Sequence, residues 1–204
     1  SRLEKIGIAL SMKETRAFFS ACEPGGAPTT GWAVENRAPT RVPKRPELQA
    51  LDAKAPGNRA ELEPMDATLA APVLDMLRRA PAGATFRLAM YGVSASSPEF
   101  QDMLAAAKRG VKLRVVMYNE YNEPAIDALK ALKTQGLDVD VRVISARVMH
   151  QKFGVCGDDV WNGSANMSLS SIGKDSEDRF AFRNDNELAQ KFGYEFERLW
   201  AKGH

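Results

Sequence analysis

The sequence predicts an α/β fold with a mixed, mainly parallel sheet flanked by helices. Strand-like segments at 85–93, 111–118 and 138–144 alternate with helix-like segments at 97–110 and 123–136. Strands that alternate with helices of this length form βαβ units, whose strands run parallel. The chain has 204 residues, of which 44% are hydrophobic, so it can bury one substantial core.

The helices are predicted from apolar residues that recur every three or four positions. Leu69, Val73 and Leu77 form such a face in the segment 65–81. A second face lies in the closing segment 186–200, at Leu188, Phe192, Phe196 and Leu199. The alternating run 178–183, which precedes that helix, predicts a further strand.

The first 65 residues differ from the rest and are predicted to form an N-terminal extension to the domain at 66–204. Residues 24–64 are rich in Pro, Gly and Ala, and no apolar period runs through them. We expect an extended or loop-like insertion there. Basic residues between 37 and 59 either form a solvated surface or contact an anionic ligand.

Composition sets wide limits on function. The net charge of +2 and the pI near 8.5 neither require nor exclude a nucleic-acid partner. No window approaches the ~18–20 apolar residues of a membrane span, so a soluble protein is expected. Cys22 and Cys156 are too few for a disulfide framework, and either a single bridge or a free thiol at Cys156 is open. The chain starts at Ser1, so the native N-terminus is expected to be missing, and the compartment, secreted or periplasmic included, is undetermined.

The stretch VMHQKFGVCGDDVWNGSAN carries the polar residues of greatest interest. Alternation along a strand places His150 and Lys152 on one face. Gly157 can open a two-residue hairpin turn, and the returning strand leads to Ser164 and Asn166. The hairpin would therefore gather an imidazole, an ammonium, a hydroxyl and a carboxamide, a set suited to a phosphate group.

The order His150-x-Lys152, then Gly163-Ser164-x-Asn166, then Glu177 resembles the HKD motif of the phospholipase D superfamily. The resemblance extends over about 66–200 and is closest to the small, single-motif, nuclease-like members. It implies a phospholipase D/nuclease-like fold and a single-HKD catalytic domain at 66–204.

One position departs from the family pattern. The family usually carries an Asp five residues after the motif Lys, and that position is Gly157 here. Asp158 or Asp159 could replace it, or the function could dispense with it; the sequence leaves this open.

The resemblance implies a metal-independent reaction without a cofactor. One His attacks phosphorus to form a phosphohistidine, and a second His protonates the leaving oxygen and then activates water. Lysine and asparagine stabilise the non-bridging oxygens, and the family carboxylate that orients the His ring matches Glu177. The expected catalytic residues are His150, Lys152, Ser164, Asn166 and Glu177, of which Lys152, Ser164 and Asn166 would contact the substrate.

This chemistry needs two histidines, and the sequence holds only His150 and the C-terminal His204, which is expected to be frayed. As in the single-motif members of the family, we therefore expect a C2 homodimer whose two copies of the motif face each other across the axis. The disfavoured alternative is a longer chain that carries a second motif. The YNEY segment at 118–121 follows a strand, and ligands bind at the carboxyl ends of parallel strands, so this loop is expected to flank the site.

The favoured function is a phosphodiesterase, specifically an endonuclease on DNA or RNA. The small single-motif chain and the basic residues of its N-terminal part favour a phosphate-backbone partner. The alternative is a phospholipase D-type lipid hydrolase, including a toxin or effector. A non-catalytic nucleic-acid-binding or lipid-binding protein is disfavoured, because none of the five site residues has been lost.

Overall fold

The computed structural model describes three short N-terminal strands and most of the chain from residue 69 onward. The described ranges are 14–19, 29–33, 61–64, 69–146, 148–173, 175 and 177–204. Cys22 and the basic residues between 37 and 59 lie outside these ranges, so the expectations for them stay predictions.

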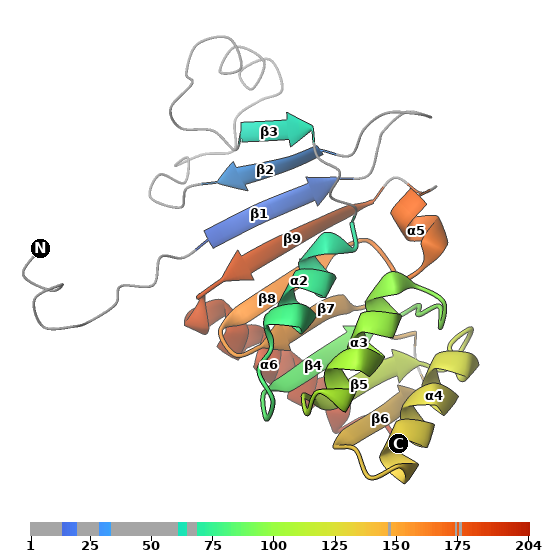
Figure 1. Ribbon diagram of the computed structural model, residues 1–204. Coiled ribbons are helices and arrows are strands. Elements are labelled where there is room, and N and C mark those ends of the chain that lie inside the picture. The colour runs from blue at the N-terminus through green and yellow to red at the C-terminus, as the bar shows by residue number, and fades with distance from the viewer. Residues whose placement is uncertain are drawn as a thin grey trace, which may run out of the picture.

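Within the described residues, nine strands form a single sheet (Figure 1). Their bounds are β1 Glu14–Phe19, β2 Thr29–Ala33, β3 Glu61–Pro64, β4 Thr85–Met90, β5 Lys112–Tyr118, β6 Val139–Ile144, β7 Lys152–Cys156, β8 Asp159–Gly163 and β9 Asp178–Arg183. They lie in the order β3-β2-β1-β9-β8-β7-β4-β5-β6.

The sheet is mixed, and the predicted α/β class is confirmed. From β9 to β6, the strands β4, β5, β6 and β8 run in one direction and β7 and β9 in the other. Directly paired parallel strands are confined to β4-β5-β6, whereas the other described neighbours pair antiparallel. The reason is connectivity: helical crossovers return the chain in parallel, while the tight turn between β7 and β8 can only join antiparallel strands.

The N-terminal part contributes more regular structure than expected. β1 pairs with β9, and β2 and β3 continue the sheet outward from β1. The expectation of a loop-like insertion over 24–64 therefore needs correction, because β2 and β3 lie within it. Strands of four and five residues that contain Gly or Pro are too short to show a period. The domain boundary at residue 65 stays a prediction.

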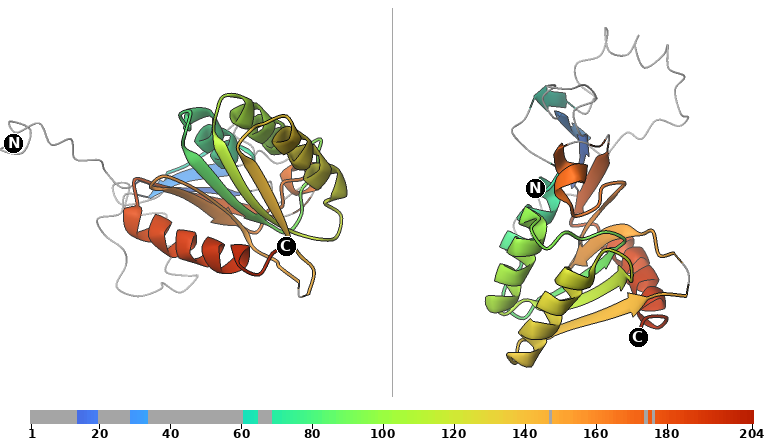
Figure 2. Two further views of the ribbon diagram at one scale, coloured as in Figure 1. Left: turned by 90° about the horizontal axis from the view of Figure 1, so that it is seen from below. Right: turned by 90° about the vertical axis from the view of Figure 1, so that its right-hand side faces the viewer.

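Helices cover both faces of the sheet (Figure 2). The helices are α2 Ala71–Arg79, α3 Pro98–Lys108, α4 Glu123–Thr134, α5 Leu169–Gly173 and α6 Asn186–Trp200. α2, α3 and α4 lie on one face and α6 on the other, while the short α5 lies in the connection from β8 to β9. No helix among the described residues is long and apolar enough to cross a membrane.

Two apolar clusters fill the space on either side of the sheet. Adjacent residues of one strand point to opposite clusters: Leu88 of β4 packs toward α3 and α4, and Ala89 packs toward α6. The same alternation separates Val115 from Val116 in β5. Burial on both faces explains why these strands are continuously apolar in the sequence.

Candidate active site

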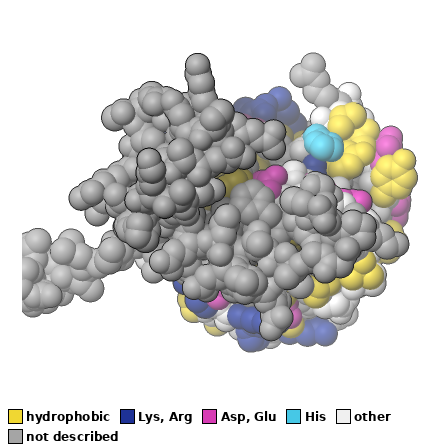
Figure 3. Space-filling model, turned by 90° about the horizontal axis from the view of Figure 1, so that it is seen from above, with side chains coloured by type: hydrophobic (Ala, Val, Ile, Leu, Met, Phe, Trp, Pro, Cys, Tyr) yellow, Lys and Arg dark blue, Asp and Glu magenta, His cyan; other side chains and the backbone are white. Residues whose placement is uncertain are grey.

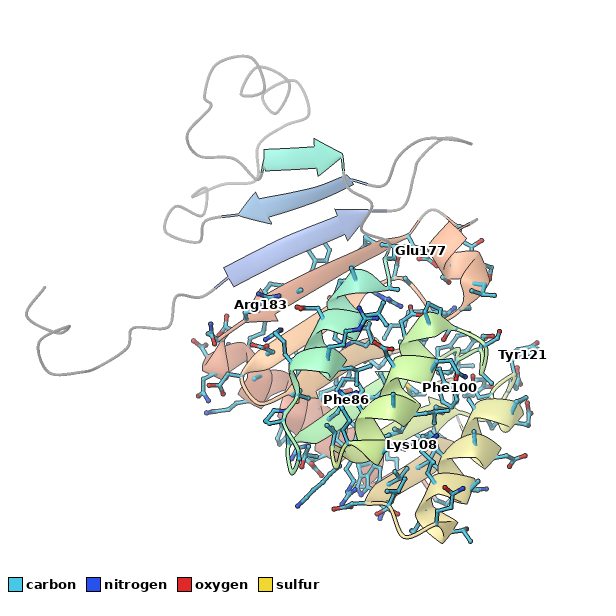
Figure 4. All side chains as sticks on the ribbon, viewed as in Figure 1. Phe86, Phe100, Lys108, Tyr121, Glu177 and Arg183 are labelled. Carbon is cyan, nitrogen blue, oxygen red and sulfur yellow. The ribbon has the colours of Figure 1, made fainter. Side chains whose placement is uncertain are left out.

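The predicted site residues meet at one end of the sheet. β7 and β9 run opposite to β4 and β8, so their first residues lie where β4 and β8 end. His150 and Lys152 lie at the start of β7, Ser164 directly follows β8, and Glu177 directly precedes β9. Figure 4 shows Glu177 at this end of the sheet.

His150 and Lys152 are in direct contact, as the strand alternation predicts. The Lys152 Nζ lies 3.1 Å from Nδ1 of the His150 ring and 3.3 Å from the His150 carbonyl oxygen. The same Nζ also lies 3.3 Å from Nε2, so it is close to both nitrogens of the ring. The pair thus places an imidazole, a side chain that can act as a nucleophile, next to a basic side chain.

The two side chains differ in their exposure. His150 is exposed, whereas Lys152 retains only 6% of its accessible surface. In the space-filling view a histidine side chain lies at the surface next to hydrophobic side chains (Figure 3). Burial lowers the pKa of the Lys152 ammonium, and the negative charge of Glu177 acts in the opposite direction.

Tyr91, which the sequence analysis did not single out, supports this pair. Its ring centroid lies 4.5 Å from that of His150 at a tilt of 50°, and the Lys152 Nζ lies 5.2 Å from the Tyr91 centroid. The ring also stacks on Tyr118 at 5.4 Å. Tyr91 directly follows β4, at the carboxyl end of a parallel strand. Ligands bind at such ends, so this position could have indicated Tyr91 as a site residue from the sequence.

The hairpin that carries the motif forms as predicted. β7 and β8 pair antiparallel around a turn in which Gly157 has a φ of 59°, a left-handed conformation that favours glycine. Asp158 and Asp159 lie at this turn, at the opposite end of β7 from Lys152. Asp159 accepts a bond of 2.9 Å from Arg79, and Asp158 accepts one of 2.9 Å from Asn186. Both carboxylates thus fasten the turn to neighbouring elements.

Cys156 occupies the last position of β7 and is a half-buried free thiol. Burial raises the pKa of this thiol, so it stays protonated rather than acting as a thiolate nucleophile. Its partner in the bridge that the sequence left open, Cys22, lies outside the described residues.

Ser164 connects β8 to the carboxylate of Glu177. Its hydroxyl donates to Glu177 Oε2 and accepts a bond of 3.0 Å from the backbone N–H of Asp178. Glu177 also accepts a bond of 3.5 Å from Ser171. The preceding Gly163 is required here, because a Cβ would lie 2.8 Å from the Cα of Arg179 on β9. The small residue lets the two strands approach and hold Ser164 beside Glu177.

Asn166 lies next to Gly92, the residue that follows Tyr91. A Cβ on Gly92 would lie 3.0 Å from Asn166 Cγ, so glycine makes room for this side chain. Backbone bonds join the two segments: Met167 N–H donates to the Gly92 carbonyl at 3.0 Å. Asn166 Oδ1 is buried and has no hydrogen-bond partner among the described residues.

A buried ion pair that the sequence analysis missed holds the Asn166 segment in place. Arg179 and Glu99 are fully buried, and Arg179 Nη1 lies 3.0 Å from Glu99 Oε1. Arg179 Nη2 donates to the carbonyls of Asn166 at 2.9 Å and Ala165 at 3.3 Å. A single guanidinium thus fixes the backbone of the GSxN motif to α3 and β9.

No group of three or more His, Cys, Asp or Glu side chains within the described part of the chain could hold a metal ion. His204 was expected to be frayed, but its backbone exchanges hydrogen bonds of 3.0 and 3.2 Å with Val143 at the edge of the sheet. The expectation of a frayed C-terminus was therefore wrong. The last three residues of the sequence carry no pattern that indicates backbone bonds to a distant strand.

A family model described as "Cardiolipin synthase, PLD-like domain" matches residues 73–200, which include the whole gathered site. The chain belongs to the phospholipase D superfamily. This superfamily member is 33% identical over 99 residues to mitochondrial cardiolipin hydrolase of Danio rerio. The match covers 48% of this chain and 43% of that relative, so the chain spans less than half of the relative's length.

Two solved structures share the phospholipase D fold with this chain. The phospholipase D family member Nuc from Salmonella typhimurium is 25% identical, with a TM-score of 0.56 over 65% of this chain and 86% of that one. NucT from Helicobacter pylori is 18% identical, with a TM-score of 0.54 over 64% and 86% of the two chains. Membership of the superfamily supports a phosphodiesterase-type hydrolase function.

Proposed function

We propose that this superfamily member is a nuclease that cleaves phosphodiesters through a phosphohistidine, without a metal ion. The observation that carries the proposal is the contact of the exposed His150 ring with the buried Lys152 ammonium, at 3.1 Å. The imidazole supplies a nucleophile that substrate can reach, and the cation stabilises charge on the non-bridging oxygens in the transition state.

In the first step a ring nitrogen of one His150 attacks phosphorus. The N–P bond forms, the ester P–O bond breaks, and the leaving oxygen takes a proton from a second imidazole. In the second step that imidazole accepts a proton from water, the water oxygen bonds to phosphorus, and the N–P bond breaks. The products are a phosphomonoester and a free hydroxyl, and the first His150 is regenerated.

Lys152, Asn166, Ser164 and Glu177 have separate parts in this scheme. The Lys152 ammonium and the NH2 group of the Asn166 amide donate hydrogen bonds to non-bridging oxygens. Glu177, held by Ser164, keeps a negative charge near Lys152 and orients the His ring. Ser164 is exposed, and in this scheme it contacts the substrate.

The second imidazole belongs to another copy of the chain. The sequence contains one other histidine, His204, and its backbone is bonded to the sheet edge at Val143. A C2 homodimer that brings two His150 side chains together supplies both the nucleophile and the acid.

A nucleic acid is the favoured substrate, and a phospholipid is the second candidate. The compact single-motif domain and the mildly basic pI near 8.5 favour a phosphate backbone. The lipid alternative, including a toxin or effector, is supported by the relative named mitochondrial cardiolipin hydrolase. A decayed, purely binding protein is disfavoured, since all five site residues are present.

One experiment separates these candidates. The protein is incubated with EDTA and, separately, plasmid DNA, single-stranded DNA, RNA and vesicles that contain cardiolipin. We expect cleavage of nucleic acid that survives EDTA, is abolished in His150→Ala, and persists in the matched control His204→Ala. A covalent phosphohistidine should be trapped by acid-free quenching of wild type with end-labelled substrate.

The other outcomes are equally informative. Cleavage of cardiolipin alone would replace the nuclease by the lipid hydrolase. Loss of activity in EDTA that added metal restores would contradict the metal-independent mechanism. Binding without turnover of any substrate would favour the non-catalytic protein.

A further inference from the structure

A hollow adjoins the candidate site, and its lining includes Tyr91 and Asn166. It has a volume of about 500 Å³ and opens between the loop after β4 and the loop after β5. Residues of both loops line it, among them Tyr91, Tyr121 and Pro124, together with Asn166. Tyr91 also contacts His150, and Asn166 belongs to the motif, so the hollow continues directly from the site.

The Asn122 side chain joins the segment after β4 to the end of β5 through hydrogen bonds to backbone atoms. It is fully buried, and its amide nitrogen donates to the carbonyls of Tyr91 at 2.7 Å and Tyr118 at 2.8 Å. Its amide oxygen accepts a bond of 2.7 Å from the backbone N–H of Val93. Because a single side chain bonds to the backbone of both segments, their relative position is set before any substrate arrives.

Tyr121 is held in an unfavourable conformation. Its φ is 65°, a left-handed value that is uncommon for a residue other than Gly, Asn or Asp. Its side chain is 78% exposed, so burial of the ring does not compensate for this backbone conformation. Strain of this kind is retained mainly at functional sites. Tyr121 belongs to the lining of the hollow, and Figure 4 shows it at the periphery of the molecule.

The chemistry of the lining identifies the ligand class. None of the described residues that line the hollow carries a charge, so it is not a second phosphate site. The exposed ring of Tyr121 offers a face for stacking, whereas the Tyr91 ring already contacts Tyr118 and His150. The hydroxyls of Ser94 and Ser96 bond to each other at 3.0 Å, and each hydroxyl keeps a further hydrogen-bonding position for a polar edge. A flat ring with a polar edge matches both properties, whereas an acyl chain would leave the hydroxyls unused.

We infer that this hollow binds the nucleobase next to the scissile phosphate, stacked on Tyr121, in an unpaired strand. The inference rests on the proposed nuclease function. A base that is paired in a duplex cannot offer its face to a side chain, so the site selects single-stranded DNA or RNA.

The test compares two single-stranded oligonucleotides that differ by one base. One is intact, and the other carries an abasic residue next to the cleaved bond. Tyr121→Asn removes the ring and keeps a residue that tolerates the positive φ. We expect this variant to lower kcat/KM on the intact strand roughly tenfold and to leave the abasic strand unchanged. Tyr121→Phe should behave like wild type.

A matched control and a binding measurement complete the test. Tyr194 on α6 is 76% exposed and outside the hollow, so Tyr194→Ala should change neither substrate. With 2-aminopurine at the tested position, binding to His150→Ala should quench the fluorescence, and binding to the His150→Ala, Tyr121→Asn double variant should not.

An equal effect of Tyr121→Asn on both strands, or no effect on either, would overturn the inference while leaving the nuclease intact. Preferred cleavage of duplex DNA by wild type would do the same. Failure of wild type to cleave any nucleic acid would instead remove the proposed function itself. If Tyr121→Asn then impaired release of a lipid head group, the hollow would belong to a lipid substrate.

Discussion

Lys152 is the residue whose environment decides how the site responds to pH. A cation with 6% of its surface exposed has lost most of its hydration, so its charged form is less favoured than that of a lysine in water. Glu177 compensates in part, because its negative charge raises the pKa of Lys152. The proposed reaction needs the ammonium form, so activity must fall where Lys152 loses its proton.

Glu177→Gln should therefore move the alkaline limb of the pH profile to lower pH. Burial already lowers the pKa of Lys152, and removal of the carboxylate takes away the charge that raises it. The measurement is kcat/KM against pH across the alkaline range for wild type and variant. Glu187→Gln on α6 is the control and should leave the limb in place. A limb that stays fixed or moves to higher pH in Glu177→Gln would contradict this assignment.

At the scale of the elements, α3 and β9 are joined by the Glu99–Arg179 pair. Both side chains are fully buried, so the pair cannot exchange its partners for water when one is lost. Arg179 also holds the carbonyls of Ala165 and Asn166, which makes the position of the motif depend on this contact.

Arg179→Met should reduce the free energy of unfolding by about 3–5 kcal/mol, since it leaves the Glu99 carboxylate buried without a cation. The double variant Glu99→Leu, Arg179→Met should lose less than the single one, because no charge is then stranded. Urea denaturation measures both. Lys191→Ala removes an exposed pair with Glu187 and should cost less than about 0.5 kcal/mol. A double variant that is less stable than Arg179→Met would contradict the argument.

The regular elements could be predicted from the sequence because their signals are local. Each helix and strand from α2 to β6, as well as β9 and α6, lies within the segment that apolar periodicity indicates. The β7–β8 hairpin followed from one glycine and two alternating strands. The strands β2 and β3 were missed because four or five residues that include a Gly or a Pro are too few to show a period. In β1, ETRAFF, the apolar residues fall together at the end and do not alternate.

The candidate site was predicted in its motif residues but not in its supports. His150 and Lys152 are two residues apart, so strand alternation alone places them together. Arg179 and Glu99 are 80 residues apart, and Asn122 is 29 residues from Val93. Such contacts form only when the helices pack on the sheet. No pattern of neighbouring residues in the sequence predicts them.

At the scale of the whole molecule, the proposed mechanism needs a second imidazole, which a homodimer would supply. If each site uses His150 from both subunits, a dimer with one His150→Ala subunit is inactive. Random co-assembly of equal amounts of wild type and this variant should leave about one quarter of the activity of the same total of wild type, against about one half for independent sites.

Co-expression of the two forms followed by an assay of the purified mixture measures this fraction, and light scattering gives the mass of the particle. Co-assembly of wild type with His204→Ala is the control and should keep full activity. A monomeric particle that remains active, or a mixture that retains half of the activity, would contradict the shared site.

Because Glu99 and Arg179 are closed off from solvent, dissolved ions cannot reach and screen their attraction. The capture of a polyanion follows the opposite rule, because it draws on the release of counterions and weakens steeply as salt rises. The Glu99–Arg179 attraction should therefore depend little on ionic strength, whereas the affinity for the proposed nucleic-acid substrate should depend on it strongly. High salt should therefore abolish binding of the proposed substrate while Arg179 still holds the segment of Ala165 and Asn166. Dilution of the salt alone should restore activity.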